Sequence, residues 1–242
     1  MRTAVLLAVA ACSFPEKHAG SGDGSIAIDA APDAETPFSC VGMPFQATAP
    51  SHIAISGTAL DLGTGAIAAG LPVTGMTNAG ATVFSTTTDG SGDFSSTLDT
   101  GGVAVDAYVV TSGSAYAPSY FYPAHPFVGD AITPLPMLTP PELAMLNPAG
   151  SGFAQLLLGD CLGNGLGSCT LEVTPAPALV EYSKNGKPDP TATSTEASGY
   201  VLVEGLVAGG SSSFAATCPT GALRVASLPI APDSTYFIEL VP

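Results

Sequence analysis

The sequence has 242 residues, with 20 Asp or Glu against five Lys or Arg, so its formal net charge is −15 at pH 7. Binding to nucleic-acid phosphates needs clustered basic residues, and five are too few for such a stripe. The 28 glycines, the 22 prolines and a charged fraction of only 10% favour short strands and turns over long helices. We therefore predict an all-β fold, long enough for two small domains, with no nucleic-acid partner.

Residues 1–12 are typical of a secretory signal, with one basic residue, a short apolar run and a small-residue site that ends in Cys12. The run is too short to span a bilayer, which needs about 20 apolar residues. The sequence VAAC at 9–12 resembles the lipobox of bacterial lipoproteins, which implies export and a lipid anchor on Cys12. Ser13 favours the outer membrane or cell surface by the same resemblance. The alternative is an ordinary cleaved signal in which Cys12 is incidental.

Residues 13–37 are rich in Ala, Asp, Gly, Ser and Pro and lack the apolar bulk that a core requires. We predict a disordered acidic tether with a reach of about 25–30 Å, which would hold the folded part away from the membrane. Residues 38–50 contain prolines that interrupt regular structure, together with Phe38, Cys40 and Phe45. They are expected to form an extended lead-in that packs on a domain.

The motif GATVFSTTTDGSGDF at 80–94 indicates a strand, an acidic and glycine-rich turn, and a second strand. Its turn, TDGSGDF at 88–94, is echoed by TEASGYV at 195–201, which predicts two similar units at 51–140 and 151–242. Residues 141–150 form the joint, where the prolines and PPELAML at 140–146 predict one or two helical turns. Further strands are predicted from period-2 alternation, at 53–59, 103–109, 116–122 and 131–138 in the first unit and at 153–158, 169–174, 179–182, 200–205, 213–218, 222–228 and 235–241 in the second.

A family resemblance rests on four motifs within residues 51–140: ISGTALD, GATV, TDGSGDF and SYFYP. Together they resemble the carboxypeptidase regulatory-like domain, a transthyretin-like β-sandwich of about seven strands. The lipobox, the tether, CVGMPFQATAP and two such units in tandem resemble uncharacterised lipoproteins of myxobacteria and their relatives. The resemblance implies two tandem transthyretin-like, Ig-like sandwiches, the second matching less well. It brings no activity, because the peptidase part is absent.

Four cysteines follow the tether, namely Cys40, Cys161, Cys169 and Cys218, and an even number in an exported chain predicts two disulfides. Three pairings are possible. Cys161 and Cys169 could close a hairpin, whereas a Cys169–Cys218 bond within the second sandwich would leave Cys40 for Cys161. The second arrangement is slightly preferred, because fastening the lead-in closes a loop that is worth about 4–5 kcal/mol.

No other pattern predicts chemistry, so we expect no catalytic residue, no bound metal and no cofactor. The sequence lacks CxxC, HExxH, GxSxG and P-loop motifs. Asp89–Asp93 offers alternate oxygens for calcium, but the EF-hand pattern is not met and a hairpin explains the same residues. Asp99, Asp106 and Asp130 could converge in an acidic enzyme site, although a solvated face is the simpler interpretation.

An aromatic cluster at 108–127 offers a possible binding surface formed by Tyr116, Tyr120, Tyr122 and His125. Aromatic rings with prolines can bind a sugar or a peptide, but packing in a core or between domains is the favoured alternative. Because alternate strand residues point to opposite faces, Tyr120 and Tyr122 cannot share the face of Phe121. The absence of Trp argues against a carbohydrate platform.

These patterns predict a non-enzymatic, lipid-anchored cell-envelope protein whose β-sandwich modules present or bind a partner, either an envelope protein or a glycan. One alternative is a small enzyme, or an enzyme accessory protein, with an acidic site. Another is a calcium-dependent binding module.

Overall fold

The computed structural model describes residues 40–223 and 226–242, so the predicted signal, Cys12 and the tether lie outside the described residues. Within the described part of the chain, no helix is long and apolar enough to cross a membrane. Apart from the short helix α1 (Pro140–Leu146), the regular structure consists of strands, which confirms the all-β prediction.

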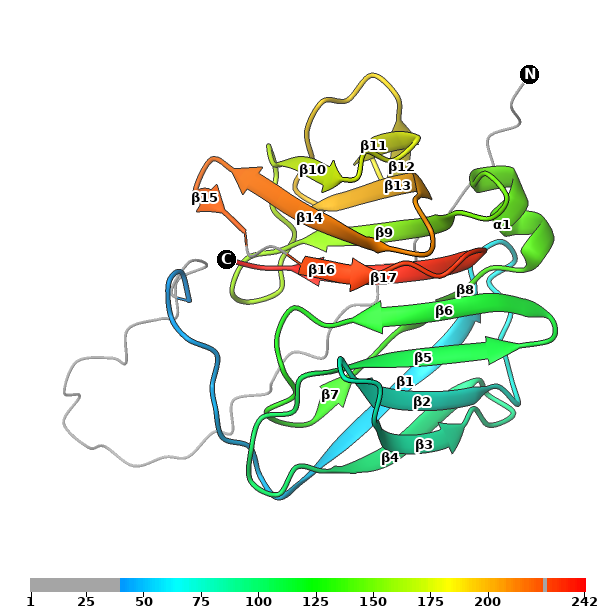
Figure 1. Ribbon diagram of the computed structural model, residues 1–242, viewed down its shortest axis with the longest axis vertical. Helices are drawn as coiled ribbons and strands as arrows, with labels where there is room; N and C mark the ends of the chain where they lie inside the picture. Colours follow the sequence, from blue (N-terminus) through cyan, green and yellow to red (C-terminus); the bar gives the residue numbers. More distant parts are fainter. Residues whose placement is uncertain (1–39, 224–225) are drawn as a thin grey trace, which may run out of the picture.

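The first unit is a sandwich of two sheets (Figure 1). In one sheet the long strand β1 lies between an antiparallel neighbour and two short parallel ones, namely β1 (His52–Asp61), β4 (Asp93–Asp99), β7 (Ala131–Ile132) and β8 (Leu135–Met137). The facing sheet has the order β6-β5-β2-β3, with β2 (Pro72–Thr77), β3 (Thr82–Thr87), β5 (Ala107–Gly113) and β6 (Tyr116–Tyr122).

The second unit repeats this plan. Its larger part has the order β12-β11-β13-β9-β17, with β9 (Gly152–Leu158), β11 (Leu179–Lys184), β12 (Lys187–Asp189), β13 (Tyr200–Leu206) and β17 (Ser234–Leu240). Its smaller sheet is centred on β14 and contains β10 (Thr170–Thr174), β14 (Ser211–Cys218), β15 (Gly221–Ala222) and β16 (Ala226–Pro229).

The two units share one sheet, which the sequence did not predict. Strand β17 runs parallel to β9 of its own unit and also parallel to β6 of the first unit, so that Phe237 lies opposite Gln155 on one side and Phe121 on the other. The result is a nine-stranded sheet that passes through both sandwiches (Figure 1). The predicted tandem sandwiches are therefore joined by continuous backbone hydrogen bonding.

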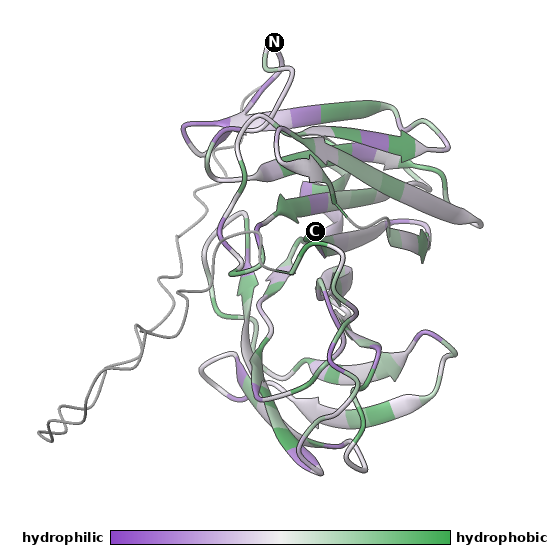
Figure 2. Ribbon diagram, turned by 90° about the vertical axis from the view of Figure 1, so that its left-hand side faces the viewer, coloured by the Kyte–Doolittle hydropathy of each residue, from purple (hydrophilic) through white to green (hydrophobic). Residues whose placement is uncertain are grey.

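The two cores lie on opposite faces of this shared sheet. Phe121 and Phe237 stack at 5.7 Å and belong to the core of the first unit, beneath β1, β4 and β8. Tyr122 and Tyr236, whose side chains alternate with those two, belong to the core of the second unit, beneath β10, β14 and β16. In Figure 2 the units lie one above the other, with hydrophobic segments on the strands of each.

The predicted repeat is present as equivalent strands and equivalent hydrogen bonds. In the first unit, the first strand β1 pairs antiparallel with β4, which follows the TDGSGDF turn, and parallel with the last strand β8. In the second unit, β9 likewise pairs antiparallel with β13, which follows the TEASGYV turn, and parallel with the last strand β17. The order β2-β5-β6 likewise corresponds to β10-β14-β16.

The joint forms the predicted short helix. Thr139 caps α1 in a capping box with Glu142, and Pro140 lies in its first turn. Leu143 is buried against Leu138 of the first unit and Phe153 of the second, so the helix packs on both.

Both disulfides of the preferred pairing are present. Cys169 and Cys218 link the neighbouring strands β10 and β14, and Cys40 and Cys161 are 5.7 Å apart between their Cα atoms. The lead-in also bonds to the first unit, where Ala104 N–H donates to the carbonyl of Ala47 at 3.0 Å. The lead-in is thus attached to both units, as an extended segment packed on the fold.

Candidate functional site

The described chain contains a cavity of about 380 Å³ at the junction of the two units. Its walls come from the first unit, the second unit and the lead-in, since it is lined by Phe45, Asn78, Asp106, Ala107, Tyr122, Pro123, Ala124, Ala226, Ser227, Leu228, Ile238, Glu239, Leu240 and Val241. This volume lies in the range of small-ligand sites. We call it the junction cavity.

Asn78 and Asp106 form a polar pair on the side of the first unit. Asn78 lies in the turn after β2 and Asp106 immediately precedes β5. The Asn78 side-chain amide donates to Oδ2 of Asp106 at 2.8 Å. Both residues are exposed, so their remaining donors and acceptors can reach a ligand.

Glu239 lies on the side of the second unit, near the end of β17. Its carboxylate is partly buried and accepts a hydrogen bond from Ala124 N–H at 3.3 Å. Burial raises the pKa of this carboxyl above its ordinary value, against the opposing effects of the Ala124 hydrogen bond and the nearby His125. The junction cavity therefore contains a carboxyl group that is biased toward its protonated form.

Four tyrosines cross the shared sheet beside this cavity. Tyr108 stacks on Tyr122 with centroids 4.8 Å apart, and Tyr120 stacks on Tyr236 at 5.0 Å. Burial raises the pKa of Tyr122, and it raises that of Tyr236 to about 12. Tyr108 and Tyr120 remain half-buried, with the Tyr108 hydroxyl 3.8 Å from the sulfur of Met76. The two outer rings thus form a half-buried aromatic surface next to Tyr122, which lines the cavity.

The structure does not place the predicted binding residues Tyr116, Tyr120, Tyr122 and His125 on one surface. Tyr122 is only 7% exposed and belongs to the second core. Tyr116 begins β6, packs against the first core and is hydrogen-bonded to Asp61, whereas His125 follows the other end of the strand. Seven strand residues span about 20 Å, so Tyr116 and His125 lie at opposite ends of β6 and do not form one compact patch. Of the four, Tyr120 belongs to the half-buried aromatic surface, and Tyr122 lines the cavity. The His125 ring lies 6.3 Å from that of Phe45, another lining residue.

Other members of the site were missed because they are far apart in sequence. Tyr236 and Glu239 lie on β17, whereas Asn78 lies in the turn after β2, and none of the three carries a local motif. The one available signal was the alternation in STYFIEL at 234–240, which matches that of YFY at 120–122. Both segments place aromatic rings on the two faces of a strand.

The acidic loop at Asp89–Asp93 uses its oxygens within the turn. Oδ1 of Asp89 accepts from the N–H groups of Ser91 and Asp93 at 2.7 and 3.1 Å, and Asp93 accepts from the Thr58 hydroxyl. The remaining acidic candidates also bond to separate partners, Asp99 lying 4.0 Å from His52 and Asp130 accepting from Ala54 N–H. Among the described residues, no three His, Cys, Asp or Glu side chains gather in a way that could hold a metal ion.

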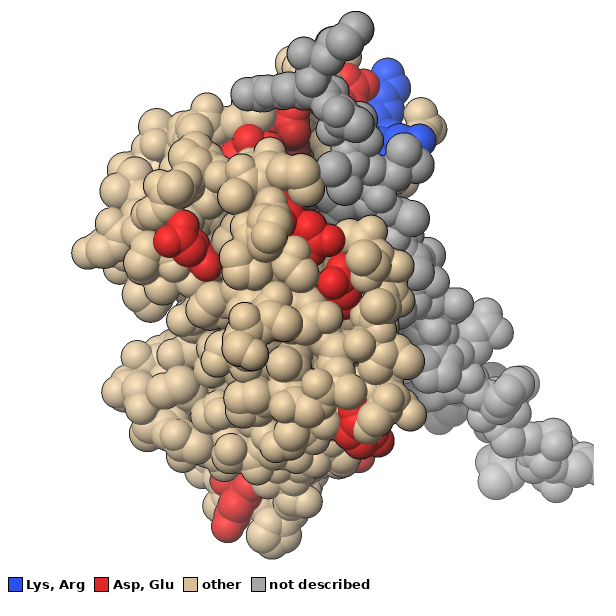
Figure 3. Space-filling model, turned by 90° about the vertical axis from the view of Figure 1, so that its right-hand side faces the viewer, with Lys and Arg blue, Asp and Glu red and all other residues tan. Residues whose placement is uncertain are grey.

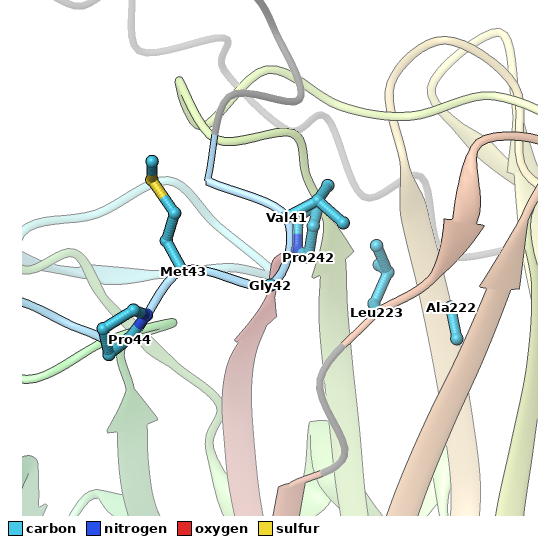
Figure 4. A pocket seen from close by; sticks show the side chains of 7 residues that line it. All are labelled: Val41, Gly42, Met43, Pro44, Ala222, Leu223 and Pro242. Carbon is cyan, nitrogen blue, oxygen red and sulfur yellow. The ribbon is translucent and has the colours of Figure 1, made fainter.

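Acidic side chains are spread over both units, as Figure 3 shows for one face. The described basic residues, Lys184 and Lys187, lie together on the β11–β12 hairpin. A second hollow, of about 520 Å³, is lined by Val41, Gly42, Met43, Pro44, Ala222, Leu223 and Pro242. Figure 4 shows that these are apolar side chains, with Met43 extending away from the others. It offers no polar side chain that would orient a ligand.

No protein-family model matches the sequence, and no curated protein is detectably similar to it. Solved structures give weak likenesses. The TIE protein of Bacillus anthracis is 12% identical with a TM-score of 0.29, over 79% of this chain and 33% of its own. The chain thus spans about a third of that protein.

Two further likenesses cover nearly all of the other protein. The shaft pilin SpaA of Lactobacillus rhamnosus is 11% identical with a TM-score of 0.26, over 81% of this chain and 98% of its own, in a double-mutant structure. A candidate carbohydrate-binding protein of Bacteroides uniformis is 12% identical with a TM-score of 0.30, over 74% of this chain and 97% of its own. These values are too low to transfer a family or a function.

Proposed function

We propose that the protein is an exported, lipid-anchored protein of the cell envelope whose two joined sandwiches form a non-enzymatic binding module. The observation that supports it is the junction cavity. The Asn78 amide, the carboxylates of Asp106 and Glu239 and the ring of Tyr122 line it beside apolar side chains, and such a combination can orient a ligand. A segment of an envelope protein, or a glycan, has the matching chemistry.

The shared sheet would keep this site rigid. Each wall of the cavity belongs to a different unit, so relative movement of the units would destroy it. Strand β17 is paired with both units, and Leu143 of α1 packs between them. A site whose walls are fixed in advance loses little entropy on binding.

Attachment to the membrane is proposed from the sequence at 9–12, with Cys12 as the lipidated residue. The predicted tether at 13–37 would lead to the Cys40–Cys161 disulfide, and Phe45 of the lead-in lines the junction cavity. Two disulfides support export, because such bonds persist in oxidising compartments.

Metabolic labelling with fatty acid or glycerol tests the anchor. We expect label in the wild type, no label in Cys12→Ala, and label in the control Cys40→Ser, which removes a cysteine that is paired in the fold. Label retained in Cys12→Ala would overturn lipidation at this residue.

Arrays of glycans and peptides, probed with the purified protein, test the binding role. We expect a bound class whose signal falls in Asp106→Asn and remains in Asp99→Asn, since both aspartates are exposed and only Asp106 lines the cavity. Loss of binding in both variants, or no bound class on either array, would count against a binding site at the junction.

A hydrolase is the second candidate, because one cavity contains two carboxyl groups and burial raises the pKa of one of them. A protonated acid beside a second carboxyl is an arrangement used in acid–base hydrolysis. Assays with chromogenic glycosides and esters distinguish a hydrolase from a binding module. Product release that is lost in Glu239→Gln and retained in Glu172→Gln, an exposed residue on β10, would favour the hydrolase, whereas no release favours the binding module.

A further inference from the structure

Strand β16 has an edge that faces away from its sheet. Among the described residues it pairs with β14 alone. Ile230 N–H donates to Gly210, and Ile230 C=O accepts from Gly209, in the turn that leads into β14. Because backbone groups alternate along a strand, those of Leu228 also point toward β14 and those of Ser227 point away. The N–H and C=O of Ser227 are therefore directed outward.

The internal repeat shows what this edge can accept. Strand β6 has the place in the first unit that β16 has in the second, since the orders β2-β5-β6 and β10-β14-β16 correspond. The outer edge of β6 carries an added parallel strand, β17, in the register Thr235 with Ser119 through Ile238 with Tyr122. Within this molecule, an edge of this type is already completed by a strand from another unit.

A half-buried aromatic surface lies where a strand added to β16 would run. The small sheet packs on the shared sheet over β9, β13 and β17 (Figure 1). Residues of its last strand, β16, line the junction cavity together with Ala107 and Tyr122 of the first unit. Beyond it, Tyr108 and Tyr120 on β5 and β6 are half-buried. One further strand would extend the small sheet over these two rings.

Charge indicates what kind of segment fits. Asp106 and Glu239 are the charged residues among those lining the cavity, and both are acidic. The predicted tether is a poor occupant, because residues 13–37 contain five acidic residues and one lysine. A basic segment would place a cation beside the partly buried Glu239, the exposed Asp106 and the tyrosine rings, where interactions with both carboxylate and ring are favourable.

Among the described strands of a second copy, the one equivalent to β17 is already engaged. The first-unit equivalent of β17 is β8, and its outer side is already bonded to β6: Ala117 N–H donates to Leu138 at 2.9 Å and the Ser119 hydroxyl donates to Pro136 at 2.8 Å. Donation of β8 would break these contacts. The occupant is therefore a different protein.

We propose that an extended, basic segment of a partner protein adds to β16 as a further strand, covers Tyr108 and Tyr120, and places a Lys or Arg side chain beside Glu239. Main-chain hydrogen bonds give such additions their affinity, and alternate side chains give specificity. This rests on the proposed binding function and names its ligand.

A displayed library of random ten-residue peptides, selected on the purified protein, tests the proposal. We expect enrichment of peptides rich in Lys or Arg. In titrations of a selected peptide, Ser227→Pro should weaken binding at least about tenfold, because it removes the outward N–H, while the fold persists since Pro is tolerated at such edge positions. Glu239→Gln should weaken it about three- to tenfold, and the control Glu172→Gln less than about twofold.

N-methylation of alternate peptide residues removes the same strand pairing without altering the protein, so the test does not depend on the folding of Ser227→Pro. Loss of binding on methylation supports strand addition. Binding that resists both changes, or selected peptides without basic bias, would overturn this proposal and leave a binding function in place. Self-association abolished by Ser227→Pro would identify a second copy as the occupant instead, and no enrichment together with an empty glycan array would overturn both proposals.

Discussion

Thr88 and Thr195 make the same pair of hydrogen bonds in the two units. The Thr88 hydroxyl donates to the carbonyl of Ala68 and accepts from Leu71 N–H, both at 2.9 Å. The Thr195 hydroxyl donates to the carbonyl of Leu166 at 2.6 Å and accepts from Cys169 N–H at 3.0 Å. The two residues are 3% and 4% exposed. One short side chain therefore fastens the turn to the loop at 68–71 in the first sandwich and at 166–169 in the second, and it satisfies backbone groups that have no ladder partner.

Replacing either threonine by valine should destabilise the protein by about 2 kcal/mol, because the shape is kept while a buried N–H and a buried C=O lose their partner. Similar values are expected for Thr88→Val and Thr195→Val, measured by urea unfolding. Thr97→Val, at an exposed site on β4, should change stability by less than about 0.5 kcal/mol. A large loss at only one of the two sites would show that the motifs are not energetically equivalent.

Such local requirements explain why the repeat could be predicted from sequence. Gly92 and Gly199 close the two turns at φ values of 73° and 70°. A Cβ would lie 2.9 Å from the Ala59 carbonyl in one unit and 2.3 Å from that of Leu158 in the other. Threonine and glycine at these positions are needed for short-range reasons, so the spacing between them remains visible in the sequence.

The junction of the units could not be predicted in this way. Period-2 alternation identifies 235–241 as a strand but does not say that it lies between β9 and β6. Both faces of this strand are buried, as is typical of a central strand. The cavity depends on this arrangement, because Asp106 and Glu239 meet only when β17 joins the first unit.

Ser212→Ala should stabilise the protein by about 1 kcal/mol. The Ser212 side chain is fully buried in β14, and its hydroxyl makes no hydrogen bond in the described structure. Alanine removes that desolvated group and leaves only a small void. Urea unfolding measures the change, with the partly exposed Ser213→Ala as the neighbouring control. A destabilised Ser212→Ala would imply that the hydroxyl has a partner, such as a buried water.

Glu239→Gln should change how stability depends on pH. The pKa of Glu239 is raised in the fold, so the folded state binds this proton more tightly than the unfolded chain does. Below the ordinary carboxyl pKa of about 4.3, Glu239 is protonated in both states and does not lower the stability of the fold. Its destabilising effect develops as pH rises through the raised pKa. We expect the variant to gain stability relative to wild type between acidic and neutral pH. Glu172→Gln controls for removal of a surface charge, and equal pH profiles for Glu239→Gln and wild type would contradict the assignment.

The two disulfides should differ in what their removal releases. Cys169 and Cys218 close a separation of 49 residues inside the second unit, so their replacement by serine should cost about 2–4 kcal/mol and lower the Tm of the whole protein. Cys40 and Cys161 fasten the lead-in, whose Val41 and Met43 are more than half exposed. Limited proteolysis should therefore cut near residues 40–50 in Cys40→Ser while the sandwiches resist. Equal protection of the lead-in in both variants would contradict this division.

Tyrosine titration should reveal the buried pair at high pH. Burial raises the pKa of Tyr122 and brings that of Tyr236 to about 12, so both keep their protons in the fold at a pH where an unfolded tyrosine ionises, near 10. The contribution of these two tyrosines to the free energy of unfolding is present in full below about pH 10 and is lost as pH rises further, because ionisation then favours the unfolded chain.

Tyr122→Phe is the cleaner variant for testing this. The Tyr236 hydroxyl accepts a hydrogen bond from Ala231 N–H at 2.6 Å, so its removal would also leave that amide without a partner. Absorbance at 295 nm and urea midpoints between about pH 9 and 11 should show wild-type stability falling more steeply than that of Tyr122→Phe. Parallel pH profiles would mean that Tyr122 ionises in the folded state.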